Sequence, residues 1–196
     1  MTLIAGCIIA GGLARRMGGG DKGLRRVGDM TILARVSARL RPQVAMLALN
    51  ANGDPSRFAV YGLPVLPDPM QDHPGPLAGI LAGLTWAREM GAAWLVTAPG
   101  DAPFLPEDLV ARLLAGRGQA RFACALSAGQ AHPVAALWPV SAEPDLRAAL
   151  LSGQRAIHRF TAGHVAHVEW DTQPTDPFFN MNTPEDAAEA ERLATL

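Results

Sequence analysis

LIAGCIIA, at residues 3–10, is a continuous apolar run that leads into two glycines. An uninterrupted run of this kind is typical of a strand that is buried on both faces of a parallel sheet. Apolar residues then recur at helical spacing over residues 32–40, and Pro42 ends that helix before a second apolar run at residues 44–49. The opening of the chain therefore predicts a strand, helix, strand unit.

The same alternation continues along the chain. Apolar residues recur at helical spacing over residues 77–84, directly after Pro76, and residues 94–98 are predicted to form the next strand. Further elements are expected as strands at 65–66, 121–126, 133–138 and 165–169 and as a closing helix from Pro184. The pattern predicts an α/β fold of three layers, Rossmann-like, in a single domain over residues 1–196. Its sheet is mainly parallel with one antiparallel excursion, and ligands should bind at the carboxyl ends of the strands.

The composition excludes several classes of protein. Of the 196 residues 49% are apolar and 18% are charged, which is too hydrophobic for a disordered chain. The longest stretch without charge, residues 122–142, is broken by turn and strand signals, so no membrane helix is expected. The first basic residues follow the apolar run, the reverse of a secretory signal, and we expect a cytoplasmic protein. Cys7 and Cys124 are predicted to be reduced core thiols.

The charge is unevenly distributed. The formal net charge is −1, yet residues 13–41 carry eight basic and two acidic side chains, a balance of +6, which leaves −7 for the remainder. A positive pole on a nearly neutral protein suits a small anion such as a nucleotide better than a long nucleic acid. A solvated basic helix face is the alternative.

The glycine-rich stretch IAGGLARRMGGGDKG, residues 9–23, follows the first strand. Glycines let backbone amides turn inward, so the stretch is suited to cradling phosphate oxygens. Two familiar motifs do not apply. The G-x-G-x-x-G spacing lies well beyond the strand end, and Walker A fails because Lys22 is followed by Gly23. A flexible surface loop is the alternative reading.

Lys22 is the only lysine in the chain, against sixteen arginines. An ammonium on a flexible stem can follow a phosphate whose geometry changes during a reaction, whereas a guanidinium prefers a fixed planar fork. Lys22 is therefore a candidate for phosphate binding, unless one lysine remained by chance.

Two aspartates follow predicted strands. Asp101, in PGDAPFLPEDL at residues 99–109, is well placed to hold Mg²⁺ bridging nucleotide phosphates. Asp68 follows the short strand at 65–66 and precedes Pro69. An Asx-turn or a helix cap is the alternative for Asp101, and a turn residue for Asp68.

FFNMNTPED, residues 178–186, places Asn180 and Asn182 two apart, so both amides face one side of an extended segment and could share a ligand. Local turn bonding is the alternative. Thr183 is suited to cap the helix that follows. The five histidines show no metal-ligand spacing, and no Ser–His–Asp arrangement is apparent.

Taken together, these segments resemble the molybdenum cofactor guanylyltransferase family over nearly the whole chain. The first motif alone would indicate only the wider nucleotidyltransferase superfamily, whereas the extended R-R-M-G-G-x-D-K-G-L form with N-x-N-T-P-E-D is more specific. Departures are small: Ile9 stands where the family usually has Leu, and Gly100 occupies a variable position. The resemblance is carried by IAGGLARRMGGGDKG, NAN (50–52), Asp68, GPLAG (75–79), PGDAPFLP (99–106), HPV (132–134) and FFNMNTPED.

The resemblance implies a nucleotidyltransferase fold and the transfer of GMP from Mg-GTP to the terminal phosphate of molybdenum-molybdopterin, with release of pyrophosphate. It implies Lys22, Asp101 and Arg16 as catalytic residues and Asp101 as the Mg²⁺ ligand. Asn180 and Asn182 would face the molybdopterin, or Asn182 would complete the metal site. Apo-molybdoenzymes or their chaperones are further candidate partners, and neither nucleic acid nor membrane is expected. The residues implied to bind GTP or to belong to the same loop are Ile9, Ala10, Gly11, Gly12, Gly19, Lys22, Asn50, Asp68 and Asp101.

Three alternatives stay open at this point. A cytidylyltransferase acting on molybdopterin would share the first loop and the metal aspartate, although that group typically begins its loop with Ala-Ala-Gly where this chain has Ala10, Gly11 and Gly12. A dinucleotide-dependent oxidoreductase would need the glycine fingerprint at the strand end. A non-catalytic module that binds the pterin cofactor would have no use for Asp101.

Overall fold

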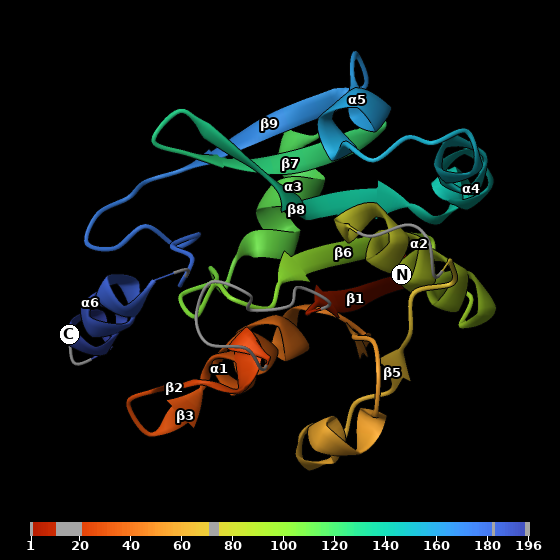
Figure 1. Ribbon diagram of the computed structural model, residues 1–196. Helices are drawn as coiled ribbons and strands as arrows, with labels where there is room; N and C mark the ends of the chain where they lie inside the picture. The colour runs from red at the N-terminus through yellow and green to blue at the C-terminus, as the bar shows by residue number, and fades with distance from the viewer. Residues whose placement is uncertain (1, 11–20, 71–74, 182, 195–196) are drawn as a thin grey trace.

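A seven-stranded sheet in a three-layer α/β arrangement forms the centre of the molecule (Figure 1). The computed structural model describes residues 2–10, 21–70, 75–181 and 183–194. The strand order is β5-β4-β1-β6-β8-β7-β9, and only β8 runs antiparallel to its neighbours. The strands are β1 (Ile4–Ile9), β4 (Met46–Asn50), β5 (Val65–Leu66), β6 (Trp94–Pro99), β7 (Phe122–Ser127), β8 (Gln130–Pro139) and β9 (Val165–Trp170).

Helices cover both faces of this sheet and form two hydrophobic cores. One core receives side chains from α1 (Ile32–Leu40), α3 (Leu109–Gly116) and α6 (Pro184–Leu193). The other core receives side chains from α2 (Pro76–Glu89), α4 (Glu143–Leu151) and α5 (Ile157–Thr161). The predicted fold, three layers on a mainly parallel sheet with one antiparallel excursion, is confirmed. The remaining elements are the hairpin β2 (Arg26–Val27) and β3 (Met30–Thr31), and the 3-10 turns η2 (Lys22–Leu24), η3 (Arg41–Gln43), η4 (Pro55–Tyr61) and η5 (Val140–Ala142).

Strand β1 is buried on both faces, which explains why its apolar residues do not alternate with polar ones. Ile8 lies in one core and Cys7 in the other, and both are fully buried. Helix α2 approaches this strand closely at Gly83, where a Cβ would lie 3.1 Å from the Cβ of Cys7. Cys7 and Cys124 are free thiols, as predicted, and burial raises their pKa values to about 12 and about 11.

Several boundaries differ from the sequence prediction. The connection between β7 and β8 is tighter than expected, because β7 extends to Ser127 and β8 begins at Gln130. Ala128 and Gly129 make this turn with φ of 48° and 74°. Helices α3, α4 and α5 and the β2–β3 hairpin were not predicted. Within the described ranges no helix is long and apolar enough to cross a membrane.

The sheet has a topological switch point between β1 and β6. From β1 the chain adds β4 and β5 on one side and then crosses to place β6 on the other side. Loops that leave the carboxyl ends of two such strands diverge, which opens a crevice for a ligand. Ala10, directly after β1, and Gly100 and Asp101, directly after β6, lie at this switch point.

Candidate active site

The carboxyl ends of four parallel strands carry most of the described candidate residues. Ile9 ends β1 and Ala10 follows it, Asn50 ends β4, and Asp68 and Asp101 follow β5 and β6. Backbone bonds tie these ends together. Ala10 donates its N–H to the Asn50 carbonyl at 2.9 Å, and Gly100 donates to the Ile9 carbonyl at 3.0 Å. The sheet thus holds the sequence-predicted residues along one edge.

Lys22 and Asp101 meet at the switch point, with Nζ and Oδ2 3.9 Å apart. Both side chains keep partial access to solvent, 22% for Lys22 and 27% for Asp101. The η2 turn that begins at Lys22 rests on the loop after β6, since a Cβ at Gly23 would lie 3.2 Å from the Gly100 carbonyl oxygen. Thus a glycine at position 23 lets the lysine come close to the aspartate.

The electrostatic state of Asp101 is set by two opposing effects. Burial raises the pKa of its carboxyl, and the Lys22 ammonium lowers it by a smaller amount, so the net shift is upward. Burial disfavours the charged form because the carboxylate loses water. A second cation beside this partly buried carboxylate would stabilise its charged form, and this is the chemistry expected of a metal ligand.

The residue before Lys22 is held by a separate ion pair. Arg57, in η4, places its Nε 2.6 Å from Asp21 Oδ2, and a terminal nitrogen lies 3.4 Å from Oδ1. Its guanidinium also donates to the Asn52 carbonyl at 2.5 Å. Arg57 therefore connects the start of η2 with the loop that follows β4.

A second cluster surrounds Asp68. The Asn50 amide donates to Asp68 Oδ1 at 2.9 Å and to the Leu66 carbonyl at 3.0 Å. Asn52 closes a two-bond ring with the same aspartate: its amide donates to Oδ2 at 2.7 Å, and its Oδ1 accepts the Asp68 N–H at 2.8 Å. Two asparagine side chains thus fix one carboxylate at this edge of the sheet.

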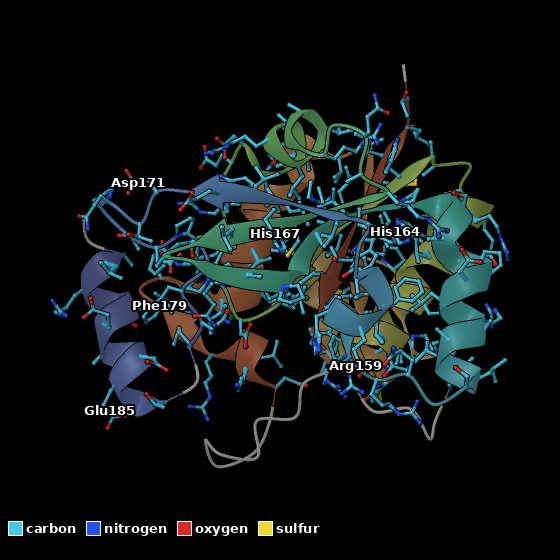
Figure 2. The ribbon with its side chains drawn as sticks, turned by 90° about the horizontal axis from the view of Figure 1, so that it is seen from above. Arg159, His164, His167, Asp171, Phe179 and Glu185 are labelled. Carbon is cyan, nitrogen blue, oxygen red and sulfur yellow. The ribbon has the colours of Figure 1, made fainter. Side chains whose placement is uncertain are left out.

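The segment that follows β9 returns to the same edge of the sheet. In Figure 2 it leaves β9 at Asp171 and passes through Phe179 toward α6, which carries Glu185. Asn180 is exposed, and the next residue, Met181, donates its N–H to the Asp101 carbonyl at 3.2 Å. Thr183 caps α6 through Asp186, as the sequence predicts for this position. The predictions for Gly11, Gly12, Arg16, Gly19 and Asn182 lie outside the described residues.

Comparison with known proteins identifies the family. The model of the MobA-like NTP transferase domain matches residues 6–168. The chain is 59% identical over 193 residues to a molybdenum cofactor guanylyltransferase of Rhodopseudomonas palustris strain BisB5, an alignment that covers 95% of this chain and 92% of that protein. This chain belongs to the molybdenum cofactor guanylyltransferase family. The identity to the family member from Nitrobacter hamburgensis is 55% over 97% of this chain and 94% of the relative.

Solved structures agree at the level of the fold. Molybdopterin-guanine dinucleotide biosynthesis protein A from Archaeoglobus fulgidus superposes with a TM-score of 0.74, covering 97% of this chain and 98% of that one. The sequence identity is 21%, so this similarity concerns the architecture. The nucleotidyltransferase fold implied by the sequence resemblance is confirmed.

Several residues of this guanylyltransferase site were not predicted. Asn52 belongs to the Asp68 cluster, and the N-x-N spacing of residues 50–52 could have indicated it, since side chains two apart share one side of an extended segment. Asp21 lies within the glycine-rich motif, but that motif does not indicate its ion pair with Arg57, and Arg57 itself belongs to no motif.

The structure also brings together a serine, a histidine and an aspartate that sequence reasoning did not connect. Ser127 Oγ lies 2.7 Å from His132 Nε2 and 2.9 Å from Asp176 Oδ1. In a nucleophilic triad the histidine stands between the other two groups and removes the serine proton. Here the serine stands in the middle, so this arrangement differs from a hydrolase triad.

Proposed function

We propose that this protein transfers GMP from GTP to the terminal phosphate of molybdenum-molybdopterin and releases pyrophosphate. The observation that carries this proposal is the Lys22–Asp101 pair at the switch point between β1 and β6, in a chain that belongs to this family. The relatives are named for guanylyl transfer. Asn50, Asp68 and Asp101 lie at or just after the carboxyl ends of neighbouring strands, which supports a shared role.

The transfer needs little covalent chemistry from the protein. A phosphate oxygen of the acceptor forms a bond to the α-phosphorus of GTP, and the bond from that phosphorus to the pyrophosphate oxygen breaks. The acceptor phosphate is already anionic at neutral pH, so no side chain has to remove a proton. Catalysis then rests on orientation and on neutralising charge.

Lys22 and the backbone of the first loop are proposed to bind the phosphates of GTP. An ammonium can move with the leaving pyrophosphate as charge develops on it. The remainder of the nucleotide is proposed to be bound by Ile9, Ala10, Gly11, Gly12, Asn50 and Asp68. Arg16 and Gly19 belong to the same phosphate-binding loop in this proposal.

Asp101 is proposed to hold Mg²⁺. The residues present fit this ion, because a carboxylate that burial disfavours in its charged form keeps partial access to solvent beside Lys22. In the described part of the chain no group of three or more His, Cys, Asp or Glu side chains could hold a metal. The further ligands would then be phosphate oxygens and water, which Mg²⁺ commonly keeps. When bound, the ion supplies charge neutralisation at the phosphates.

Asn180 and Asn182 are proposed to face the molybdopterin. Asn180 is exposed and lies one residue from the backbone bond between Met181 and Asp101. Apo-molybdoenzymes or their chaperones as receiving partners, and a cytoplasmic location, stay predictions.

The proposal is tested by pyrophosphate release from purified protein with GTP, Mg²⁺ and molybdenum-molybdopterin. We expect release with GTP and little with CTP. Release with CTP in preference to GTP would indicate a cytidylyltransferase instead. Binding of molybdopterin with no pyrophosphate from either nucleotide would indicate a non-catalytic module.

A further inference from the structure

The hydroxyl of Ser127, the last residue of β7, joins two side chains from other parts of the chain. Ser127 is buried, with 1% of its surface exposed, and its hydroxyl donates to Asp176 Oδ1. A hydroxyl has one hydrogen, and a carboxylate can only accept. The 2.7 Å contact with His132 Nε2 therefore uses a hydrogen on the histidine. The result is a directed relay in which His132 donates to Ser127 and Ser127 donates to Asp176.

The protonation state of His132 agrees with this direction. Burial lowers the pKa of the imidazole, and the neighbouring Asp176 carboxylate raises it by a smaller amount, so the net shift is downward. The ring is then neutral at pH 7, with its single proton on Nε2. The hydrogen bond between Nε2 and the Ser127 hydroxyl fixes the imidazole in this tautomer.

The relay ends on the backbone of the segment after β9. Asp176 Oδ1, the same oxygen that accepts from Ser127, also accepts the Phe178 N–H at 2.9 Å. The Asp176 carbonyl accepts the Phe179 N–H at 3.1 Å. The His132 ring stacks on the Phe178 ring, with centroids 4.6 Å apart and planes at 22°. One histidine thus reaches Phe178 through hydrogen bonds and through direct stacking.

Three residues beyond Phe178, the same segment meets the loop of Asp101, the candidate metal ligand. Met181 is buried and donates its N–H to the carbonyl of Asp101. Phe179 packs beside Phe104, which follows Asp101 in that loop, with ring centroids 6.3 Å apart. Between these two anchors Asn180 stays exposed. The segment 178–181 is therefore held at one end by the relay and at the other by the Asp101 loop.

We propose that Ser127, His132 and Asp176 are positioning residues that hold Asn180 in register with Asp101 for the acceptor half of the reaction. None of the three needs to touch GTP or the reacting phosphorus. Their effect is on where the acceptor phosphate lies relative to the GTP bound at Lys22 and Asp101. This role rests on the proposed function, whereas the mechanical link itself does not.

The chain offers a pair of variants that separate a hydrogen-bond acceptor from a charge. Both the Ser127 and the Phe178 bonds end on Oδ1 of Asp176, an oxygen that an asparagine retains. Asp176→Ala removes this acceptor, whereas Asp176→Asn keeps it and removes only the charge. Ser127→Ala breaks the relay at its centre. Ser152→Ala is the matched control, because that hydroxyl is exposed and bonds only within its own turn, to Ala149.

The first readout is amide hydrogen exchange over residues 176–181, which needs no substrate. We expect Ser127→Ala and Asp176→Ala to speed exchange of the Phe178, Phe179 and Met181 amides by about tenfold to a hundredfold. Asp176→Asn should stay near wild type, as should Ser152→Ala. If exchange in this segment is unchanged by both alanine variants, the mechanical link does not exist.

The second readout is kinetic, with GTP and molybdenum-molybdopterin as substrates. A misplacement of about 1 Å can cost about a hundredfold in rate, so kcat/KM for molybdopterin should fall by roughly tenfold to a hundredfold in Asp176→Ala. The KM for GTP should change by less than about twofold, and Asp176→Asn should restore most of the loss. Equal losses for both substrates, or an asparagine variant as impaired as the alanine variant, would refute the positioning role.

Failure of the proposed function would look different from failure of this inference. A wild type that releases no pyrophosphate from GTP refutes the guanylyl transfer, while the exchange experiment still decides whether the relay holds the segment. If Ser127→Ala does not fold, the Asp176 pair carries the test, because Asp176 is only partly buried.

Discussion

The side-chain oxygen of Asn50 fills the space beside Gly79, where a Cβ would lie 2.1 Å from Asn50 Oδ1. Gly79 lies in the first turns of α2, and Asn50 is the last residue of β4, with 1% of its surface exposed. Helix and strand end can approach this closely only because residue 79 has no side chain. Since Asn50 also donates to Asp68, this glycine sets the position of a proposed GTP-binding pair.

Gly79→Ala is therefore expected to weaken GTP binding by displacing Asn50. Alanine favours a helix by about 1 kcal/mol over glycine, but overpacking costs about 1–3 kcal/mol, so the variant should be no more stable than wild type. We expect kcat/KM for GTP to fall by about tenfold or more, because the Asn50–Asp68 bond is lost. Gly83→Ala is the control, since its Cβ would meet Leu95 and Cys7 in the core. It should lower the thermal midpoint and leave kcat/KM near wild type.

Lys22→Ala should reduce turnover without unfolding the protein. Its ion pair with Asp101 is partly exposed and contributes little to stability. Loss of a group that neutralises charge on the transferring phosphates lowers kcat by about a hundredfold to a thousandfold. Lys22→Arg should restore only a small part, because a planar fork cannot replace a compact ammonium. Arg26→Ala, an exposed cation in the neighbouring hairpin, is the control. Near-normal pyrophosphate release in a folded Lys22→Ala variant would remove the lysine from the mechanism.

Asp101→Asn should abolish Mg²⁺-dependent activity and yet not destabilise the metal-free protein. The folded-state pKa of Asp101 is raised above the ordinary value of 3.8, so the folded state binds this proton more tightly than the unfolded state. The free energy of unfolding of the wild type therefore falls as the pH rises from the unfolded pKa of Asp101 through its folded pKa. The Asp101→Asn variant has no such loss, because its amide does not titrate. Thermal midpoints measured in a chelator from about pH 4 to about pH 7 should therefore shift in favour of the variant. A large loss of stability at neutral pH would instead favour a turn-forming role for this side chain.

The sequence predicts the central strands well because burial on both faces leaves a distinct apolar signal. β1, β4 and β6 are read from such runs, and Pro76 and Pro184 mark the starts of α2 and α6. Helices α3 and α5 escape prediction because they have only 8 and 5 residues, too short for a helical period to repeat reliably.

The site is predictable as a set of residues and less so as a network. Asp68 and Asp101 follow strand ends, and the topology of a parallel sheet places both on one edge. The partners of these residues depend on distant packing: Asn50 lies 18 residues before Asp68, and Ser127 lies 49 residues before Asp176. No local pattern encodes the relay: His132 belongs to the HPV motif at residues 132–134, but neither that motif nor Ser127 indicates a contact with Asp176, which forms only when the segment after β9 folds back on them.

Asn52→Asp tests whether Asp68 acts on GTP through its charge and its fixed orientation. In the wild type the Asn52 amide donates to Asp68 Oδ2 while its own oxygen accepts the Asp68 N–H. The substitution keeps the acceptor but replaces the donor with a second carboxylate, which repels the first. Like charges at this distance cost about 1 kcal/mol where water screens them, and a lost charge-assisted bond adds to that. We expect the KM for GTP to rise by roughly fivefold to twentyfold and kcat to change little, since the acceptor side is untouched. Gln119→Glu adds the same charge at an exposed position on the far end of the sheet and should leave both constants unchanged. If Asn52→Asp binds GTP as wild type does in direct titration, Asp68 is a turn residue and the nucleotide is held by the other strand ends.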